Sequence, residues 1–335
     1  MIPAGLAGAF GFTATGPVVA LGDGHIHRTW RVPGAAGDVV VQRINTAVFA
    51  DVAACEANLD RIDRHLAGRG LVAAWCRTAA GTVHWWDGDG VPWRVSRFAR
   101  GTVGRTVAAD ARQAFGAARR FGMFAAALAD LPGGPLADTI PRFHDLGHRR
   151  AQLAAAAAAD RCGRRAGCEP ELARAEELAA AVAARVVAVG VLPVRAVHND
   201  AKVANVRFDE VTGEATVVVD LDTTMPGTVL ADVGELLRTG ATRVAEDDAA
   251  ASVVVDAERV EAVLAGFLAG AGPLLEPAER AALAVGGPLL AVENAVRFLA
   301  DHLDGDRYYG AARPDHNLDR ARVQLSVTEG LLPFC

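Results

Sequence analysis

Four polar side chains that could carry out chemistry stand within eight residues of one another, in the spacing His198-x-Asp200-x-Lys202-x-x-Asn205. Asp200 supplies a carboxylate that can accept the proton of an attacking hydroxyl group. Lys202 is the only lysine among the 34 lysine and arginine residues, and its compact ammonium group cannot be replaced by the planar fork of an arginine. Asn205 offers an amide oxygen to a metal ion, and His198 is expected to brace the loop.

Two more acids follow this loop after a predicted hairpin. The strands Val203–Phe208 and Ala215–Val219 flank a turn at Thr212-Gly213, a residue pair that suits a tight connection. Asp220 then ends the second strand and offers a hard oxygen to Mg²⁺, and Asp222 is a candidate second ligand.

The order of loop, hairpin and acid pair matches the catalytic loop and metal-binding motif of kinases. Phosphoryl transfer from ATP asks little covalent chemistry of a protein, but it needs a carboxylate at the hydroxyl, positive charge at the γ-phosphate and a held Mg²⁺. The motif therefore predicts an ATP-dependent phosphotransferase in which Asp200 and Lys202 are catalytic, while Asn205, Asp220 and Asp222 hold the metal.

The first hundred residues are predicted to form a sheet with one helix. Short β-branched or alternating runs end at glycine-containing turns, and apolar residues at helical spacing predict the helix at 48–66. The predicted strands are Thr29–Val32, Val39–Ile44, Thr82–Trp86 and Trp93–Phe98.

The rest of the chain is rich in alanine and has helical periodicity. The predicted helices lie at 107–128, 149–160, 170–188, 256–270, 277–285, 288–303 and 317–329. With a connector at Ala99–Gly104, this order predicts an α+β, bilobal protein-kinase-like fold. Residues 1–102 would form the β-rich N-lobe that covers the nucleotide, and residues 103–335 a mostly helical C-lobe with the catalytic loop and acceptor site.

A kinase N-lobe also needs groups that contact the phosphates. Gly22 and Gly24 stand in a turn just before the predicted strand Thr29–Val32, where a glycine-rich loop would cover the nucleotide. The lysine usual on the third strand is missing, and Gln42 or Arg43 takes its position. Arg43 could contact phosphate or pair with Glu56 on the following helix, as a lysine–glutamate pair does in kinases.

Motifs along almost the whole chain resemble the N-acetylhexosamine 1-kinase-like group of the aminoglycoside phosphotransferase and choline kinase superfamily. They are GDGHIHRTW, VVVQRINTAVF, WRVSRFARGT, LADTIPRFHD, LPVRAVHNDAKVANVRFD, VVVDLDTTMPGTVLADVGELLRTGA, RFLADHLDGDRYY and RPDHNLDRARVQL. The resemblance implies transfer of the ATP γ-phosphate to the anomeric hydroxyl of N-acetylglucosamine or N-acetylgalactosamine.

The resemblance also implies a sugar site. His25, Arg297 and Tyr308 would line it, and Asp232 would brace the catalytic loop as a structural acid. From the residues alone, an internal salt bridge is the alternative for Arg297, because an unpaired charge on an apolar helix is costly. For Tyr308 the alternative is a place in the core.

One departure from the family pattern leaves the acceptor open. The family turn reads G-H-I-N-D-T, and here His27 and Arg28 replace the amide and the acid. A kinase for another hydroxyl, such as that of an aminoglycoside or nucleoside antibiotic, is therefore an alternative. A weaker one is a nucleotide-binding pseudokinase, because the strand lysine is missing.

Composition limits the partners and the compartment. The net charge of −6 argues against sequence-independent nucleic-acid binding, which requires basic stripes. No apolar run resembles a membrane span or a signal peptide. Five widely spaced cysteines without a C-x-x-C pattern predict reduced thiols in the cytoplasm. The expected partner is a small-molecule acceptor, with neither nucleic acid nor membrane.

Overall fold

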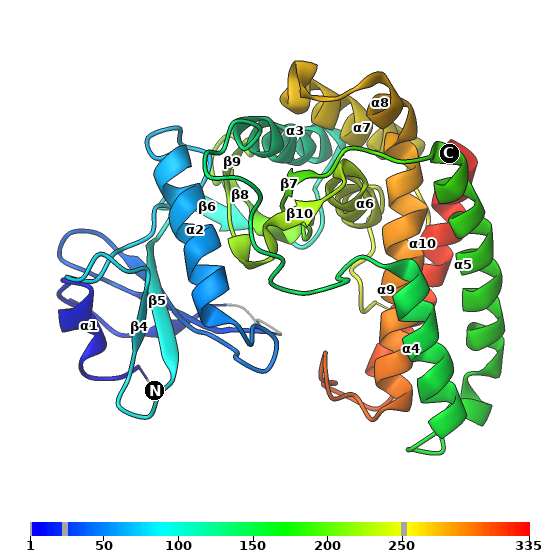
Figure 1. Ribbon diagram of the computed structural model, residues 1–335, viewed down its shortest axis with the longest axis horizontal. Helices are drawn as coiled ribbons and strands as arrows, with labels where there is room; N and C mark the ends of the chain where they lie inside the picture. The colour runs from blue at the N-terminus through cyan, green and yellow to red at the C-terminus, as the bar shows by residue number, and fades with distance from the viewer. Residues whose placement is uncertain (1, 22–25, 249–252) are drawn as a thin grey trace.

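An antiparallel sheet fills the N-terminal part of the computed structural model, which describes residues 2–21, 26–248 and 253–335 (Figure 1). Its strand order is β1-β2-β3-β5-β4. The strands are β1 (Val19–Ala20), β2 (Arg28–Val32), β3 (Val39–Arg43), β4 (His84–Trp86) and β5 (Pro92–Arg97). The short helix α1 (Leu6–Ala9) precedes them, and α2 (Val52–Leu66) runs beside the sheet.

Alternation along β3 sorts its side chains onto two faces. Val39 and Val41 are fully buried in a core that also contains Trp93 of β5. Gln42 points to the other face, where it stands directly opposite Arg94 of β5. The sheet therefore has one apolar face and one face that carries polar residues toward the rest of the chain.

Two small sheets flank the predicted catalytic loop, which runs from the end of β7 to the start of β8. One has the order β6-β8-β9, with β6 (Thr102–Gly104), β8 (Val206–Asp209) and β9 (Ala215–Val218), and the other pairs β7 (Arg195–Val197) with β10 (Met225–Gly227). The predicted hairpin is present as β8 and β9, and Gly213 has a φ of 71° in its turn, a conformation that glycine adopts without strain.

Helices make up most of the remaining chain, and α9 is flanked by α4, α5 and α10 in Figure 1. They are α3 (Ala111–Ala127), α4 (Leu146–Ala159), α5 (Glu169–Val189), α6 (Val229–Gly240), α7 (Ala257–Ala271), α8 (Pro277–Ala282), α9 (Gly286–Leu303) and α10 (His316–Leu331). The β-rich first part and helical second part confirm the predicted α+β class.

Of the α-helices and strands, α1, β1, β6, β7, β10 and α6 were not predicted from the sequence, and two of them, α6 and β6, bear on the site. Helix α6 buries every residue of Val229–Gly240 except Thr239, including Asp232, Glu235 and Arg238, which recur every three residues along the helix; this polar stripe was an available signal of an amphipathic helix. Thr102–Gly104 was taken as part of a connector, but it forms β6 and pairs with β8 of the hairpin. The domain boundary at residue 102 stays a prediction. Because β6 begins at this residue and pairs with β8, the predicted boundary lies beside the hairpin.

The stretch Pro277–Leu303 has the length and hydropathy of a membrane span, with a mean hydropathy of 1.3. It includes α8 and α9, and 83% of its apolar window is buried inside the protein. Such burial is typical of a core helix in a globular protein.

Candidate active site

The predicted catalytic loop follows β7, and a buried carboxylate from α6 holds its start. Both oxygens of Asp232 accept backbone hydrogen bonds, from the N–H of His198 at 3.1 Å and of Asn199 at 2.8 Å. Asn199 has a φ of 62°, a left-handed conformation that asparagine tolerates better than most residues. The imidazole of His198 is buried against Phe121 and Phe124. These contacts fix the backbone directly before Asp200 and so orient the Asp200 side chain.

Asp232 makes the loop sensitive to a single substitution. In Asp232→Asn one side-chain oxygen becomes an NH₂ group, so one of two buried backbone donors loses its acceptor. Leaving such a donor unpaired costs about 1–3 kcal/mol, and we expect the free energy of unfolding to fall by about 2 kcal/mol. Urea denaturation measures this, with Asp130→Asn as the control because the Asp130 side chain is 77% exposed. Equal stability of the two variants would contradict the bracing role.

Two polar side chains of the loop, those of Lys202 and Asn205, converge on one oxygen of the Asp200 carboxylate. Oδ2 of Asp200 lies 2.9 Å from Nζ of Lys202 and accepts a 2.8 Å hydrogen bond from Nδ2 of Asn205. Although burial opposes ionisation, the ammonium group of Lys202 holds the pKa of Asp200 below its usual value. Asp200 is therefore a fixed carboxylate that is ionised at neutral pH.

Asn205 is oriented with its oxygen free for another ligand. Its Nδ2 donates both to the backbone oxygen of Asp200 at 2.9 Å and to the Asp200 carboxylate. Both donor contacts fall on the same amide nitrogen, so the amide oxygen points away from Asp200. This is the arrangement required if the amide oxygen is to coordinate a metal.

The two acids of the D-x-D motif have different surroundings. Asp222 is buried, and both its oxygens are bound by the guanidinium group of Arg94. Nε2 of His27 lies 3.3 Å from the same carboxylate. Asp220, with a φ of 64°, accepts no hydrogen bond from any described residue. Although Asp220 is exposed as a residue, desolvation of its carboxylate by the surrounding protein and the neighbouring carboxylates Asp222 and Asp200 raise its pKa to about 6.

These surroundings fit Mg²⁺ at Asp220 and Asn205 but not at Asp222. A carboxylate whose pKa is raised by two other carboxylates is a place where a cation relieves repulsion. The described residues contain no cluster of three His, Cys, Asp or Glu side chains suited to a metal. Mg²⁺ does not need one, because it binds one or two carboxylates together with waters and substrate phosphates.

The structure places the predicted nucleotide-binding residues in different surroundings. Gln42 lies on the polar face of the sheet, with its side-chain oxygen 2.9 Å from Nε of Arg94. Arg43 points to the opposite face, and it forms no ion pair with Glu56 among the described residues. Glu56 instead accepts a hydrogen bond from the backbone of Val83 at 3.2 Å. Gly22, Gly24 and the predicted sugar ligand His25 lie outside the described residues.

The predicted sugar residues on the helical side differ in burial. Arg297 of α9 is 12% exposed, lies 3.9 Å from Glu293, and faces the rings of Phe143 and Tyr309. Its guanidinium group forms no hydrogen bond with a described residue. Tyr308 is 46% exposed, so the alternative that it belongs to the core is wrong, whereas its neighbour Tyr309 is buried.

Glu293 connects Arg297 to the catalytic loop through His144. Its Oε1 lies 3.0 Å from Nδ1 of His144, and Nε2 of His144 lies 2.7 Å from the backbone oxygen of Asn199. Burial lowers the pKa of His144, but the Glu293 carboxylate outweighs this effect and keeps the pKa above its usual value. Oε2 of Glu293 and the hydroxyl of Tyr309 are buried and have no partner among the described residues.

Sequence reasoning missed Arg94, Glu293 and Tyr309. Glu293 and Arg297 stand four residues apart on an otherwise apolar helix, and this pair of charges in a hydrophobic pattern was the available signal. Arg94 alternates with buried Trp93 and Val95 along β5, so only the register of the sheet shows where it points.

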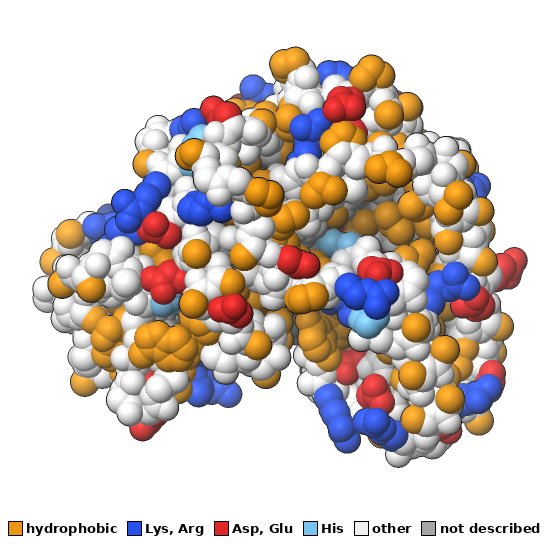
Figure 2. All heavy atoms as spheres, viewed as in Figure 1, with side chains coloured by type: hydrophobic (Ala, Val, Ile, Leu, Met, Phe, Trp, Pro, Cys, Tyr) orange, Lys and Arg blue, Asp and Glu red, His pale blue; other side chains and the backbone are white. Residues whose placement is uncertain are grey.

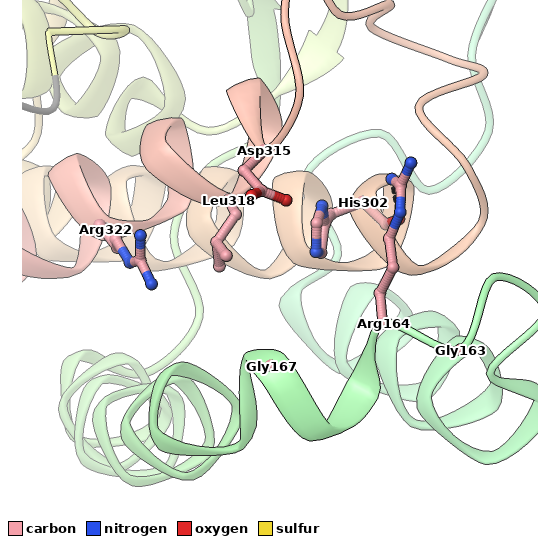
Figure 3. Close-up of a pocket in the computed structure, with 7 residues that line it drawn as sticks. All are labelled: Gly163, Arg164, Gly167, His302, Asp315, Leu318 and Arg322. Atoms are coloured by element: carbon pink, nitrogen blue, oxygen red, sulfur yellow. Dashed lines mark hydrogen bonds between the residues drawn. The ribbon is translucent and has the colours of Figure 1, made fainter.

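A pocket of about 290 Å³ is lined by no residue of the catalytic loop or of the acid pair, and it is therefore not the candidate active site. Figure 3 shows it between the end of α9, the start of α10 and the turn before α5. Arg164 and Arg322 point into it, but they are paired with Asp306 at 2.6 Å and with Glu171 at 2.7 Å. No predicted site residue lines this pocket. Figure 2 shows a further hollow in the surface, between the β-rich and helical parts.

Comparison with known proteins also indicates a phosphotransferase. A family model described as the phosphotransferase enzyme family matches residues 17–283. The match includes the catalytic loop, Asp220 and Arg94, and it stops before Glu293, Arg297 and Tyr308. Arg297 and Tyr308, which were predicted to line a sugar site, therefore lie in the part of the chain that the family model does not match.

Solved structures with similar folds extend over nearly all of the chain. Spectinomycin phosphotransferase, crystallised with ADP and spectinomycin, has a TM-score of 0.63 at 10% identity, over 98% of this chain and 95% of that one. An aminoglycoside phosphotransferase from Alicyclobacillus acidocaldarius has a TM-score of 0.63 at 15% identity, covering 100% and 94%. A choline kinase from Streptococcus pneumoniae has 0.57 at 12%, covering 95% and 93%. These likenesses confirm the predicted protein-kinase-like fold.

Proposed function

The chain belongs to the phosphotransferase enzyme family, and from this premise we propose that it transfers the γ-phosphoryl group of ATP to the anomeric hydroxyl of an N-acetylhexosamine. The coarser statement, that it is a kinase-type phosphotransferase for small molecules, rests on the family. The finer one rests on the residues beside Asp200. We propose a cytoplasmic location, in keeping with the five cysteines, which are all free thiols.

The observation that carries the proposal is the ionised carboxylate of Asp200, held by Lys202 and Asn205. In the reaction Asp200 accepts the proton of the acceptor hydroxyl as its oxygen attacks phosphorus. Asn205 and Lys202 restrict the carboxylate to one geometry, which lowers the entropic cost of reaching the transition state. The ammonium group of Lys202 lies close enough to Asp200 to stabilise negative charge on the phosphoryl oxygens.

Asp220 and the amide oxygen of Asn205 would hold Mg²⁺. When bound, the ion neutralises charge on the β- and γ-phosphates of ATP. The nucleotide would lie between the N-terminal sheet and the catalytic loop, where Gly22 and Gly24 remain proposed contacts. The Gln42 amide, which was also predicted to bind the nucleotide, is bound at both ends within the sheet, by Arg94 and Thr29. The structure offers no support for Arg43 and Glu56 as a phosphate-binding pair.

The acceptor side supports a polyhydroxylated substrate. Glu293 Oε2 and the Tyr309 hydroxyl are buried polar atoms without partners among the described residues, and such atoms are costly unless a ligand or water binds them. Arg297, beside both of them, has N–H donors free for an oxygen of the substrate. His144 joins Glu293 to the backbone of the catalytic loop. Together they could bind several oxygens of a sugar near Asp200.

One observation favours a second acceptor class. The free oxygen of Glu293 would also suit an ammonium group, because a buried carboxylate gains most from a cationic partner. A kinase for an amine-bearing acceptor, such as an aminoglycoside, is therefore the second candidate. His27 does not decide between the two, because it is buried against Asp222 rather than free to contact an acceptor.

A panel of acceptors separates these candidates. ATP consumption with Mg²⁺ would be measured against free sugars, N-acetylated sugars, amino sugars and aminoglycosides, and phosphorus NMR would identify each product. We expect a sugar 1-phosphate from N-acetylglucosamine or N-acetylgalactosamine. Turnover of amine-bearing acceptors alone would overturn the N-acetylhexosamine assignment and favour the second candidate. Nucleotide binding without turnover of any acceptor would point to a pseudokinase.

Arg297 gives a test that separates the acceptor site from the nucleotide site. Replacing a charged hydrogen-bond donor costs about 1.5–3 kcal/mol. We therefore expect Arg297→Ala to raise the KM of the acceptor by about tenfold or more while the KM of ATP stays unchanged. Arg150→Ala is the control, because Arg150 pairs with Glu176 at the surface. A higher KM for ATP with an unchanged KM for the acceptor would remove Arg297 from the acceptor site.

A further inference from the structure

A buried guanidinium group from the N-terminal sheet binds Asp222, the second acid of the D-x-D motif after the hairpin. Arg94 of β5 is fully buried, and its two terminal nitrogens bind the two oxygens of Asp222. The partners are 128 residues apart in the chain. The ring of Trp75 lies 4.8 Å from the guanidinium carbon, and His27 lies 3.3 Å from the carboxylate on its other side.

Gln42 fixes the orientation of this guanidinium group. Gln42 stands directly opposite Arg94 in the sheet, and its side-chain oxygen accepts a 2.9 Å hydrogen bond from Nε of Arg94. The other end of the amide donates to Oγ1 of Thr29 at 3.2 Å. A chain of hydrogen bonds therefore crosses three strands, from Thr29 through Gln42 and Arg94 to Asp222. A buried ion pair needs such additional partners, because desolvation otherwise outweighs the attraction.

The same positions explain why the strand lysine is absent. The run Val39–Gln42 has the form V-V-V-Q where a kinase has V-A-I-K. A lysine at position 42 would place a second positive charge beside Arg94, with one carboxylate for both. The amide of Gln42 instead accepts a hydrogen bond from Arg94. In this chain the positive charge therefore stands on β5, at Arg94, instead of at position 42 of β3, and it is directed at Asp222.

Asp222 lies in a short turn, Leu221–Thr223. One end of this turn adjoins Asp220, and the other end contacts the catalytic loop. Asp220 precedes the turn in a left-handed conformation. Thr223 follows Asp222 and donates a 2.8 Å hydrogen bond to the backbone oxygen of His198. Holding Asp222 therefore fixes both the proposed metal ligand and the start of the catalytic loop.

We infer that Arg94 is a positioning residue that replaces the missing strand lysine: it holds Asp222 away from the metal and so fixes Asp220 for Mg²⁺. The inference rests on the proposed function insofar as Asp220 is the metal ligand. It also corrects the expectation that Asp222 is a second ligand, because both its oxygens are taken by Arg94. Arg94 itself does not touch the reacting atoms.

A double-mutant cycle with Arg94→Gln, Asp222→Asn and the double variant tests this inference. Two quantities would be measured: the apparent KM for Mg²⁺ in turnover, and the rise in Tm that Mg²⁺ and ADP produce together. We expect each single variant to raise the Mg²⁺ requirement at least tenfold and to lose most of the thermal shift. The double variant should be no worse than the poorer single one, because no charge is then left unpaired.

Two further variants make the outcome specific. Arg94→Lys should not restore the wild-type KM for Mg²⁺, because an ammonium group cannot bind both carboxylate oxygens and Gln42 at once. Arg31→Gln is the matched control: it removes the β2 partner of an ion pair with Asp38, which has no hydrogen bond or ion pair with Asp220 or Asp222, and it should leave the Mg²⁺ requirement unchanged.

If Arg94→Gln does not fold, Gln42→Leu replaces it, since this change leaves the ion pair intact but removes its orientation. We expect a severalfold higher Mg²⁺ requirement. An unchanged requirement and thermal shift in these variants, or strictly additive effects in the cycle, would overturn the inference. Failure of the proposed function looks different, because the wild type would then transfer no phosphate, while the Mg²⁺-dependent thermal shift would still report on Arg94.

Discussion

Asp200→Asn is expected to lower kcat by at least about a hundredfold while nucleotide affinity stays close to that of the wild type. A positioned general base contributes about 10²–10⁴ to the rate, and an amide cannot accept the hydroxyl proton. The structure adds a reason to expect intact folding, because Asn at this position can still accept hydrogen bonds from Asn205 and Lys202. Steady-state kinetics gives kcat, and calorimetric titration with ADP gives the affinity.

The control for this variant is Asp89→Asn, an exposed acid in the turn between β4 and β5. It should have wild-type kcat. A variant at Asp200 with unchanged kcat would show that the carboxylate is not the base. Loss of both kcat and ADP binding would indicate instead that the loop has collapsed, and the experiment would then be repeated with Asp200→Ser.

Removal of the metal ligand should have a still larger effect. Lewis-acid stabilisation by a bound metal is worth several kcal/mol, and about 4 kcal/mol corresponds to roughly a thousandfold in rate. We therefore expect Asp220→Ala to reduce kcat/KM by about a thousandfold at saturating Mg²⁺. Chelation of the metal from the wild type should produce a comparable loss, reversed by added Mg²⁺.

Glu210→Ala is the matched control, because it removes an exposed acid from the hairpin that precedes Asp220. Its Mg²⁺ dependence should equal that of the wild type. If Asp220→Ala kept wild-type turnover, Asp220 would not be the metal ligand. Asp222 would then have to release Arg94 in order to bind the metal.

The catalytic loop was accessible to sequence reasoning because its chemistry is local. Asp200, Lys202 and Asn205 lie within six residues, so their spacing alone brings them to one place, and the hairpin that follows has its own turn signal. The structure brings these three side chains together around one carboxylate oxygen. Their roles in catalysis remain predictions for the experiments above.

Contacts made by the fold were not accessible in the same way. Whether Gln42 or Arg43 faces the loop depends on one step of strand register, which reverses the direction of every side chain. Arg94 reaches Asp222 only because β3 and β5 pair in the observed register. Glu293 reaches the loop only through His144. No local pattern contains such contacts, and the sequence therefore predicted the loop better than its surroundings.

The most direct test of the central claim is phosphorus NMR of the purified protein with ATP, Mg²⁺ and a mixture of N-acetylated sugars, amino sugars and aminoglycosides. We expect a new phosphate ester that forms in step with ADP, and no ester with Asp200→Asn. If ADP binds but neither the ester nor ADP from ATP appears under these conditions, the chain is not a kinase for these acceptors, and the role assigned to Asp200 is contradicted.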